Sequence, residues 1–132
     1  DDDDGAATGN GSLTAKVDGA NFNSTLAVQA TLSSGVLAFG GTGSDGQITI
    51  AIPNYTAPGT FNLGAGNMST ATYNITTAPY TGYVASMVSG SGSIVVTELS
   101  GGYVKGTFSF TGMATGGATK AITEGKFNIR LQ

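Results

Sequence analysis

Few residues in this chain of 132 can act as acids, bases or metal ligands. It contains no histidine and no cysteine, so the commonest general base, the commonest zinc ligand and the thiolate nucleophile are all missing. Outside the acidic run Asp1–Asp4, the carboxylates are Asp18, Asp45, Glu98 and Glu124. Hydrolysis of a glycosidic bond needs two carboxylates across a cleft, but two of these lie in turn sequence and two at outward strand positions. We therefore expect no catalytic residue and no enzymatic activity.

The glycine-rich stretch Gly41–Gly46 fits the dinucleotide motif G-x-G-x-x-G. That motif requires a following helix, whose N-terminus binds the pyrophosphate. Here Gln47–Ile52 follows, and its alternating isoleucines predict a strand. The stretch is therefore interpreted as a hairpin loop. Read from Gly40, it also resembles one calcium-binding nonapeptide, a motif that works through many stacked copies.

Calcium is the alternative to a protein without any cofactor. Hard cations bind carboxylate oxygens, which makes Asp1 and Asp3 of the acidic run and Asp45 of the glycine-rich loop the candidate ligands. Adjacent acids on a linker form a weak site unless other groups converge on them. The preferred interpretation is a solvated linker and no firm metal site.

Tyrosines are the remaining candidates for binding a ligand. Several lie beside glycine or proline turns, where their rings would form an aromatic platform for sugars. The other interpretation places these tyrosines at the edges of the sheet, with their hydroxyl groups exposed to solvent. The candidate ligand-binding residues are Tyr55, Tyr80, Tyr83 and Tyr103.

Charge and hydropathy exclude two classes of partner. The net charge is −3, and without Asp1–Asp4 the four remaining acids nearly balance the five bases. Nucleic-acid binding needs a basic patch, and the sequence has none. No apolar run approaches the roughly 20 residues of a membrane helix. We expect an exported chain whose signal peptide was removed before residue 1.

Alternation of apolar and polar residues predicts an all-β fold. Val104, Phe108 and Phe110 share one parity, as do Phe127 and Ile129 in the last segment, so these residues are expected in the core. Ser100-Gly-Gly102 between two such segments predicts a tight hairpin. Short strands with frequent turn signals indicate a single antiparallel β-sandwich of about ten strands, or alternatively a flattened β-barrel. Residues 1–11 are expected to form an acidic, glycine-rich linker or arm, and residues 12–132 the domain.

Together, these segments resemble a family of small surface lipoproteins of Bacteroidetes whose function is unknown. The resemblance covers nearly all of residues 12–131 and is carried by Ser12–Gly19 with Phe22, Gly59–Leu63, Gly92–Leu99, Gly106–Phe110 and Gly125–Ile129. In that family a lipidated cysteine precedes an acidic spacer that acts as a surface-export signal, and Asp1–Asp4 resembles this spacer. The resemblance implies a lipid anchor upstream of Asp1 and a location outside the cell or on the outer-membrane surface. No cysteine precedes Asp1 in this sequence, and the family brings no known catalytic residues.

Two functions are compatible with these features. The first is a binding module for a glycan or protein partner. The second is a structural subunit of an extracellular filament or surface layer, which self-assembles by strand or edge exchange. In both cases the sequence places function in the loops, the sheet edges or the acidic arm.

Overall fold

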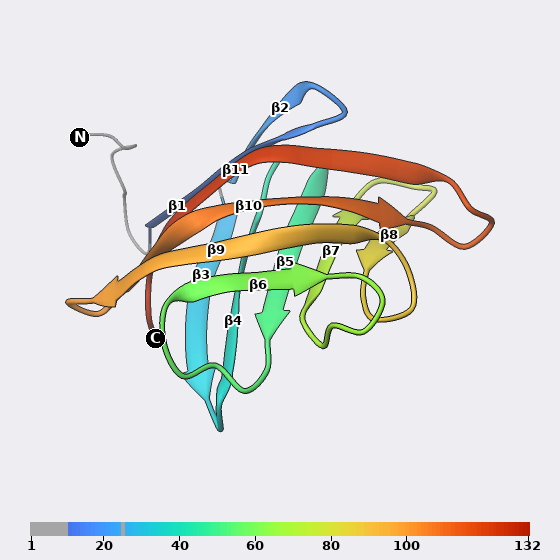
Figure 1. Cartoon of the computed structure of the whole chain (residues 1–132). Helices are drawn as coiled ribbons and strands as arrows, with labels where there is room; N and C mark the ends of the chain where they lie inside the picture. The colour runs from blue at the N-terminus through green and yellow to red at the C-terminus, as the bar shows by residue number, and fades with distance from the viewer. Residues whose placement is uncertain (1–10, 25) are drawn as a thin grey trace.

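The computed structural model describes residues 11–24 and 26–132, which form an all-β domain (Figure 1). The strands are β1 (Gly11–Val17), β2 (Ala20–Asn23), β3 (Leu26–Ser33), β4 (Val36–Thr42), β5 (Gly46–Ile52), β6 (Gly59–Leu63), β7 (Thr70–Ile75), β8 (Gly82–Ala85), β9 (Ser91–Ser100), β10 (Tyr103–Met113) and β11 (Thr119–Arg130). The first of them begins one residue before the predicted domain boundary at Ser12.

All eleven strands belong to one antiparallel sheet, which curls strongly into an open half-barrel. The strand order is β2-β1-β11-β10-β8-β7-β5-β4-β3, while β9 pairs with both β10 and β6. The predicted all-β class is confirmed, but the expected two-sheet sandwich is not clearly present. The reason is that Met113 at the end of β10 pairs with Val84 of β8, so the two halves of the sheet remain joined.

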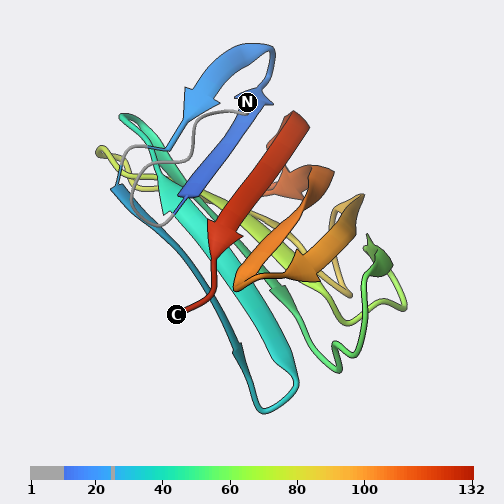
Figure 2. The same cartoon turned by 90° about the vertical axis from the view of Figure 1, so that its left-hand side faces the viewer.

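Seen from two directions, the curled sheet has two layers that enclose the core (Figures 1 and 2). We call β1, β2, β6, β9, β10 and β11 the first half and β3, β4, β5, β7 and β8 the second half. Strands of the first half cross those of the second at a steep angle (Figure 1). At the open side, a single parallel bridge joins Ala30 of β3 to Leu131.

Aromatic and branched side chains of both halves fill the space inside the curl. Phe108, Phe110, Phe127 and Ile129 are at most 3% exposed, which confirms the predicted core positions. The ring of Phe127 on β11 stacks on that of Phe39 on β4, with centroids 4.2 Å apart. This contact joins the halves directly, because the two rings belong to strands that share no ladder.

Bulges explain where simple alternation fails. β11 has one extra residue relative to both β1 and β10, and Glu124 there adopts a left-handed φ of 52°. As a result Ile122 and Gly125, three positions apart, both face the core. A similar irregularity in β3, with Ala27 at φ 55°, leaves Leu26 66% exposed although its parity matches that of buried Ala30.

The two predicted hairpins are confirmed. Gly101 and Gly102 have φ values of 61° and 83° between β9 and β10, where glycine avoids a steric cost. Gly41–Gly46 contains the turn, residues 43–45, that connects β4 to β5, and the Gly43 N–H donates to the Gly46 carbonyl at 2.8 Å. No helix follows this loop, so it cannot bind a pyrophosphate as a dinucleotide motif does.

Candidate functional site

The outer surface of β1, β9, β10 and β11 carries a polar groove of 580 Å³. Its polar side chains belong to the face opposite the core, because alternate residues of a strand point to opposite faces. Edge strand β2 contributes one more wall residue. We call this hollow the outer groove; its polar residues are Ser12, Thr14, Asn23, Thr97, Lys105, Thr107, Lys126 and Asn128.

Strand register arranges the groove residues in two parallel rows. One row runs across β1, β11 and β10 through Ser12, Asn128 and Lys105. The next row runs through Thr14, Lys126 and Thr107. Adjacent strands are about 4.8 Å apart, so each row places three polar groups within roughly 10 Å.

A bulge in β9 brings one further hydroxyl to the groove. Lys105 pairs with Glu98 and Gly106 with Val96, which leaves Thr97 as the extra residue of β9. The Thr97 hydroxyl donates to the Lys105 carbonyl at 3.1 Å. The bulge thus fixes the direction of Thr97 at the groove wall.

Positive charge in the groove comes from Lys105 and Lys126. They lie diagonally on neighbouring strands, at a backbone separation of roughly 7–8 Å. In residues 11–24 and 26–132 the ion pairs are Lys16–Glu124 at 3.8 Å and Lys120–Asp18 at 3.4 Å. No carboxylate of that part of the chain lies within 4.0 Å of either groove lysine. The neighbouring Glu98 carboxylate accepts a hydrogen bond from the Ser100 hydroxyl.

Asn128 is the direct neighbour of Lys105 across the ladder and lies two residues from Lys126 along β11. Its Oδ1 atom is buried and has no hydrogen-bond partner in the described chain. A buried acceptor left unsatisfied typically costs about 1–3 kcal/mol. The groove therefore contains one polar group whose hydrogen-bonding capacity is not used by the fold.

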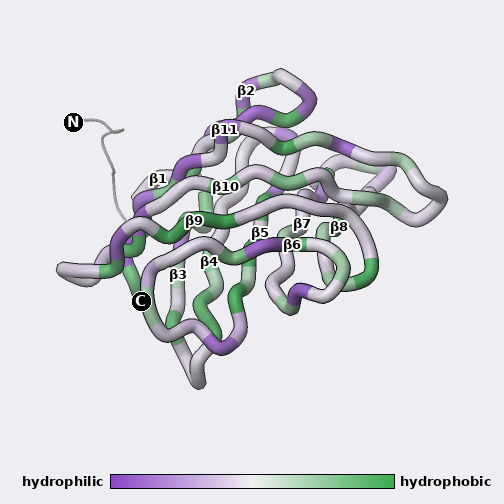
Figure 3. The backbone as a smooth tube through the Cα atoms, in the orientation of Figure 1, coloured by the Kyte–Doolittle hydropathy of each residue, from purple (hydrophilic) through white to green (hydrophobic). Residues whose placement is uncertain are grey.

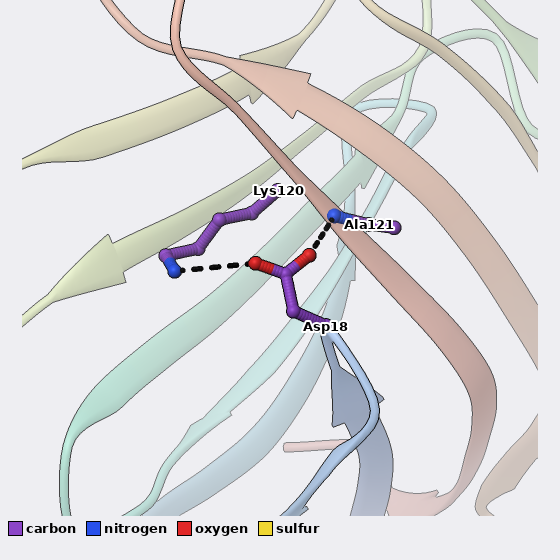
Figure 4. A network of polar contacts seen from close by, with 3 residues as sticks. All are labelled: Asp18, Lys120 and Ala121. Atoms are coloured by element: carbon purple, nitrogen blue, oxygen red, sulfur yellow. Dashed lines mark hydrogen bonds and ion pairs between the residues drawn. The ribbon is translucent and has the colours of Figure 1, made fainter.

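Asp18, in contrast, is fully engaged in holding the fold together (Figure 4). Its carboxylate accepts from the Ala121 N–H at 2.8 Å and from the Lys120 Nζ at 3.4 Å, while its own N–H donates to the Ala121 carbonyl at 2.8 Å. The Ala121 N–H, followed by Lys120, lowers the pKa of Asp18 below its usual value, against a smaller opposing effect of desolvation. With a φ of 48° next to Gly19, Asp18 forms the tight turn that connects β1 to β2.

The structure does not bring the four candidate tyrosines together. Tyr55 is 7% exposed, its hydroxyl is buried without a partner, and burial raises its pKa. Tyr80 is 77% exposed on the loop before β8. Tyr83 lies beside Gly112 near the end of β10, whereas Tyr103 starts that strand, about 30 Å away along the strand. Their sugar-binding role stays a prediction.

The other sequence candidates are also separate from the groove. Asp45 lies in the turn between β4 and β5, while Asp1 and Asp3 fall outside the described residues. Within the described chain no three acidic side chains cluster as metal ligands would. Nor do residues 11–24 and 26–132 include a helix that is long and apolar enough to cross a membrane.

Sequence reasoning assigned Lys105, Lys126 and Asn128 only to the wet face of their strands. The signal that identifies them is positional: between Gly19 and Thr97 the chain has a single charged residue, Asp45. All five bases therefore lie in β1, β10 and β11, where the register groups them on one side of the molecule.

The model of a family described as a domain of unknown function, DUF6252, matches residues 9–129. No curated protein and no solved structure matches the chain.

Proposed function

Since the chain belongs to the DUF6252 family, we propose a function from its own surface: it is a non-enzymatic, extracellular or cell-surface binding module for a glycan or protein partner. The observation that carries this proposal is the outer groove, with its two rows of outward polar side chains. Its volume of 580 Å³ lies within the range of small-ligand sites in proteins.

The cellular location of the protein is part of the same proposal. The family would consist of Bacteroidetes surface lipoproteins, with Asp1–Asp4 as the acidic spacer behind a lipid anchor. The resemblance of segments such as Gly106–Phe110 and Gly125–Ile129 supports this assignment. Protease treatment of intact source cells, followed by immunoblotting, tests it: surface protein is digested, whereas periplasmic protein survives until the outer membrane is opened.

Binding is tested with the full chain on an array of neutral and acidic glycans, and by crosslinking on the cell surface. We expect a ligand whose capture is lost when Thr14 and Thr107 are replaced by the isosteric valine. The matched control is Thr31→Val with Thr49→Val on the opposite outer surface. Equal loss in both double variants, or no ligand in either assay, would contradict the proposal.

A structural subunit is the second candidate, favoured by the sheet edges. β3 pairs only with β4 over most of its length, and it carries or adjoins Leu26, Leu32 and Val36, which are 66%, 42% and 37% exposed. Apolar edge strands recruit strands from neighbouring molecules. Light scattering at increasing concentration tests this: assembly that Leu32→Lys abolishes supports it, and a monomer throughout contradicts it.

A further inference from the structure

The outer groove combines two kinds of recognition chemistry. Ser12, Thr14 and Thr107 offer hydroxyls that both donate and accept hydrogen bonds, and Asn128 adds an amide. Lys105 and Lys126 add ammonium groups that only donate and carry positive charge. A matching ligand therefore has many hydroxyls and at least one anionic group.

The groove lacks the anchors of a protein interface. Such interfaces usually depend on buried aromatic or aliphatic side chains near their centre. None of the large exposed hydrophobic side chains of the described residues lines the groove, and Phe127 at its floor is only 3% exposed. An acidic peptide would thus find charge but no large exposed apolar side chain on which to anchor.

Smaller hollows extend the polar surface on both sides of Lys126. One lies towards β2 and includes Asn21, Asn23 and Glu124. The other lies over β9, β10 and β11 and includes Ser93, Ser109 and Glu124, whose carboxylate pairs with Lys16. Lys126 lines all three hollows. The surface therefore suits an extended chain of several units better than a single small molecule.

From this geometry we infer that the outer groove binds an acidic oligosaccharide, with Lys105 and Lys126 contacting its carboxylate or sulfate groups and the flanking hydroxyls contacting its sugar hydroxyls. This inference rests on the proposed binding function and names the class of ligand. Uronate and sulfated sugars share the anionic chemistry, and the experiment below distinguishes them.

The test is calorimetric titration of the full chain with oligogalacturonate, dextran sulfate and neutral dextran, at low and at physiological salt. We expect oligogalacturonate or dextran sulfate to bind and neutral dextran not to bind. K105Q/K126Q is expected to weaken binding by about tenfold or more, since charge-assisted hydrogen bonds are the stronger ones. Affinity should also fall as salt rises.

The control variant K120Q removes a positive charge from the same strand, and Lys120 lines none of the three hollows. Lys120 lies six residues from Lys126 along β11, roughly 20 Å away, so K120Q should change the affinity by less than about twofold, because charges beyond a Debye length are screened. Circular dichroism confirms that both variants fold. Thr107→Val keeps the charge and the shape, so its loss of affinity tests the hydroxyl contacts separately.

Four results would overturn the inference. Equal weakening by K105Q/K126Q and by K120Q would show a general charge effect, and equal binding of polyglutamate, titrated in parallel, would show that sugar hydroxyls are not recognised. Neutral-glycan binding that K105Q/K126Q leaves unchanged would refute the acidic ligand but leave the binding module standing. If none of the three polymers binds but the previous assays find a glycan or surface partner, the acidic ligand would again be refuted and the binding module would stand.

Discussion

The outer surfaces of the two halves differ in chemistry although both are built from strands of the same period. The first half carries all five bases and three of the four carboxylates that lie outside Asp1–Asp4. The second half has only Asp45, in a turn, and its outward rows contain residues such as Thr31, Ala38 and Thr49. Hydropathy along the backbone shows strongly hydrophilic segments on β1, β2 and β11 (Figure 3).

This difference shows that inward residues form the core while outward residues determine the chemistry of the surface. Inward residues of both halves are equally apolar, so core formation does not distinguish them. Outward residues need not be apolar, and they differ in charge between the two halves. A groove with two lysines on one surface and a surface whose single charge is Asp45 on the other therefore reflect something other than folding. The predictions below separate the shared core from the divergent surfaces.

The largest effect is expected where the halves touch. Phe127→Ala removes one ring of the stack with Phe39 and should reduce the free energy of unfolding by about 3–5 kcal/mol. Phe39→Ala should cost a similar amount, and the double variant should cost less than the sum by about 0.5–1.5 kcal/mol. Urea unfolding of the three variants measures this. Full additivity would mean that the halves do not depend on each other through this contact.

A moderate effect on stability is expected from adding a side chain to a tightly packed glycine. A Cβ on Gly106 would lie 1.9 Å from the Val95 carbonyl oxygen, so Gly106→Ala must shift the backbone between β9 and β10. We expect a loss of about 1–3 kcal/mol, as for other overpacked sites. Gly40→Ala, whose Cβ would lie 2.3 Å from the Ile48 carbonyl oxygen, should behave alike in the second half.

Gly59→Ala is the control for these glycine variants. Its Cβ would meet nothing within 4 Å, and its φ is not left-handed. It should be neutral or stabilise by up to about 1 kcal/mol. Thermal unfolding of all three distinguishes close packing from a general loss of glycine flexibility, which would destabilise the Gly59 variant too.

Sequence alone predicted the core well and the surface poorly. Phe108, Phe110 and Phe127 follow a period of two that burial enforces, so parity was sufficient to place them. The groove escaped prediction because it depends on register: Lys126 faces Thr14 and Thr107 only after β1 and β10 pair with β11. The bulge at Glu124 likewise could not be predicted from the sequence pattern, because Glu124 has a left-handed φ although it is not a glycine.

A smaller, pH-dependent effect is expected at the charged edge of the first half. The pKa of Asp18 is lower in the folded chain than its ordinary value. Its contribution to stability is therefore fully present above the ordinary range near pH 4 and is lost as the pH falls through the lowered pKa. Asp18→Asn should lower the melting temperature at pH 7, and this deficit should be smaller at pH 2.

Asp45→Asn is the matched control, because Asp45 is also an exposed aspartate in a turn, in the second half. Its melting temperature should follow that of the parent chain at both pH values. An Asp18→Asn deficit that is undiminished at pH 2 would mean that the side chain acts through turn geometry and not through its charge.

The smallest effect is expected from the acidic arm acting on the groove at a distance. Replacing Asp1–Asp4 by asparagine changes the net charge from −3 to +1, since four negative charges are removed. An anionic ligand should then associate faster, by less than about threefold at physiological salt and by more at low salt, because screening weakens long-range forces. Stopped-flow association at two salt concentrations measures this, with K105Q/K126Q in the same background as the control. A gain that is independent of salt would contradict this long-range effect, because salt screens the force between the arm and an anionic ligand.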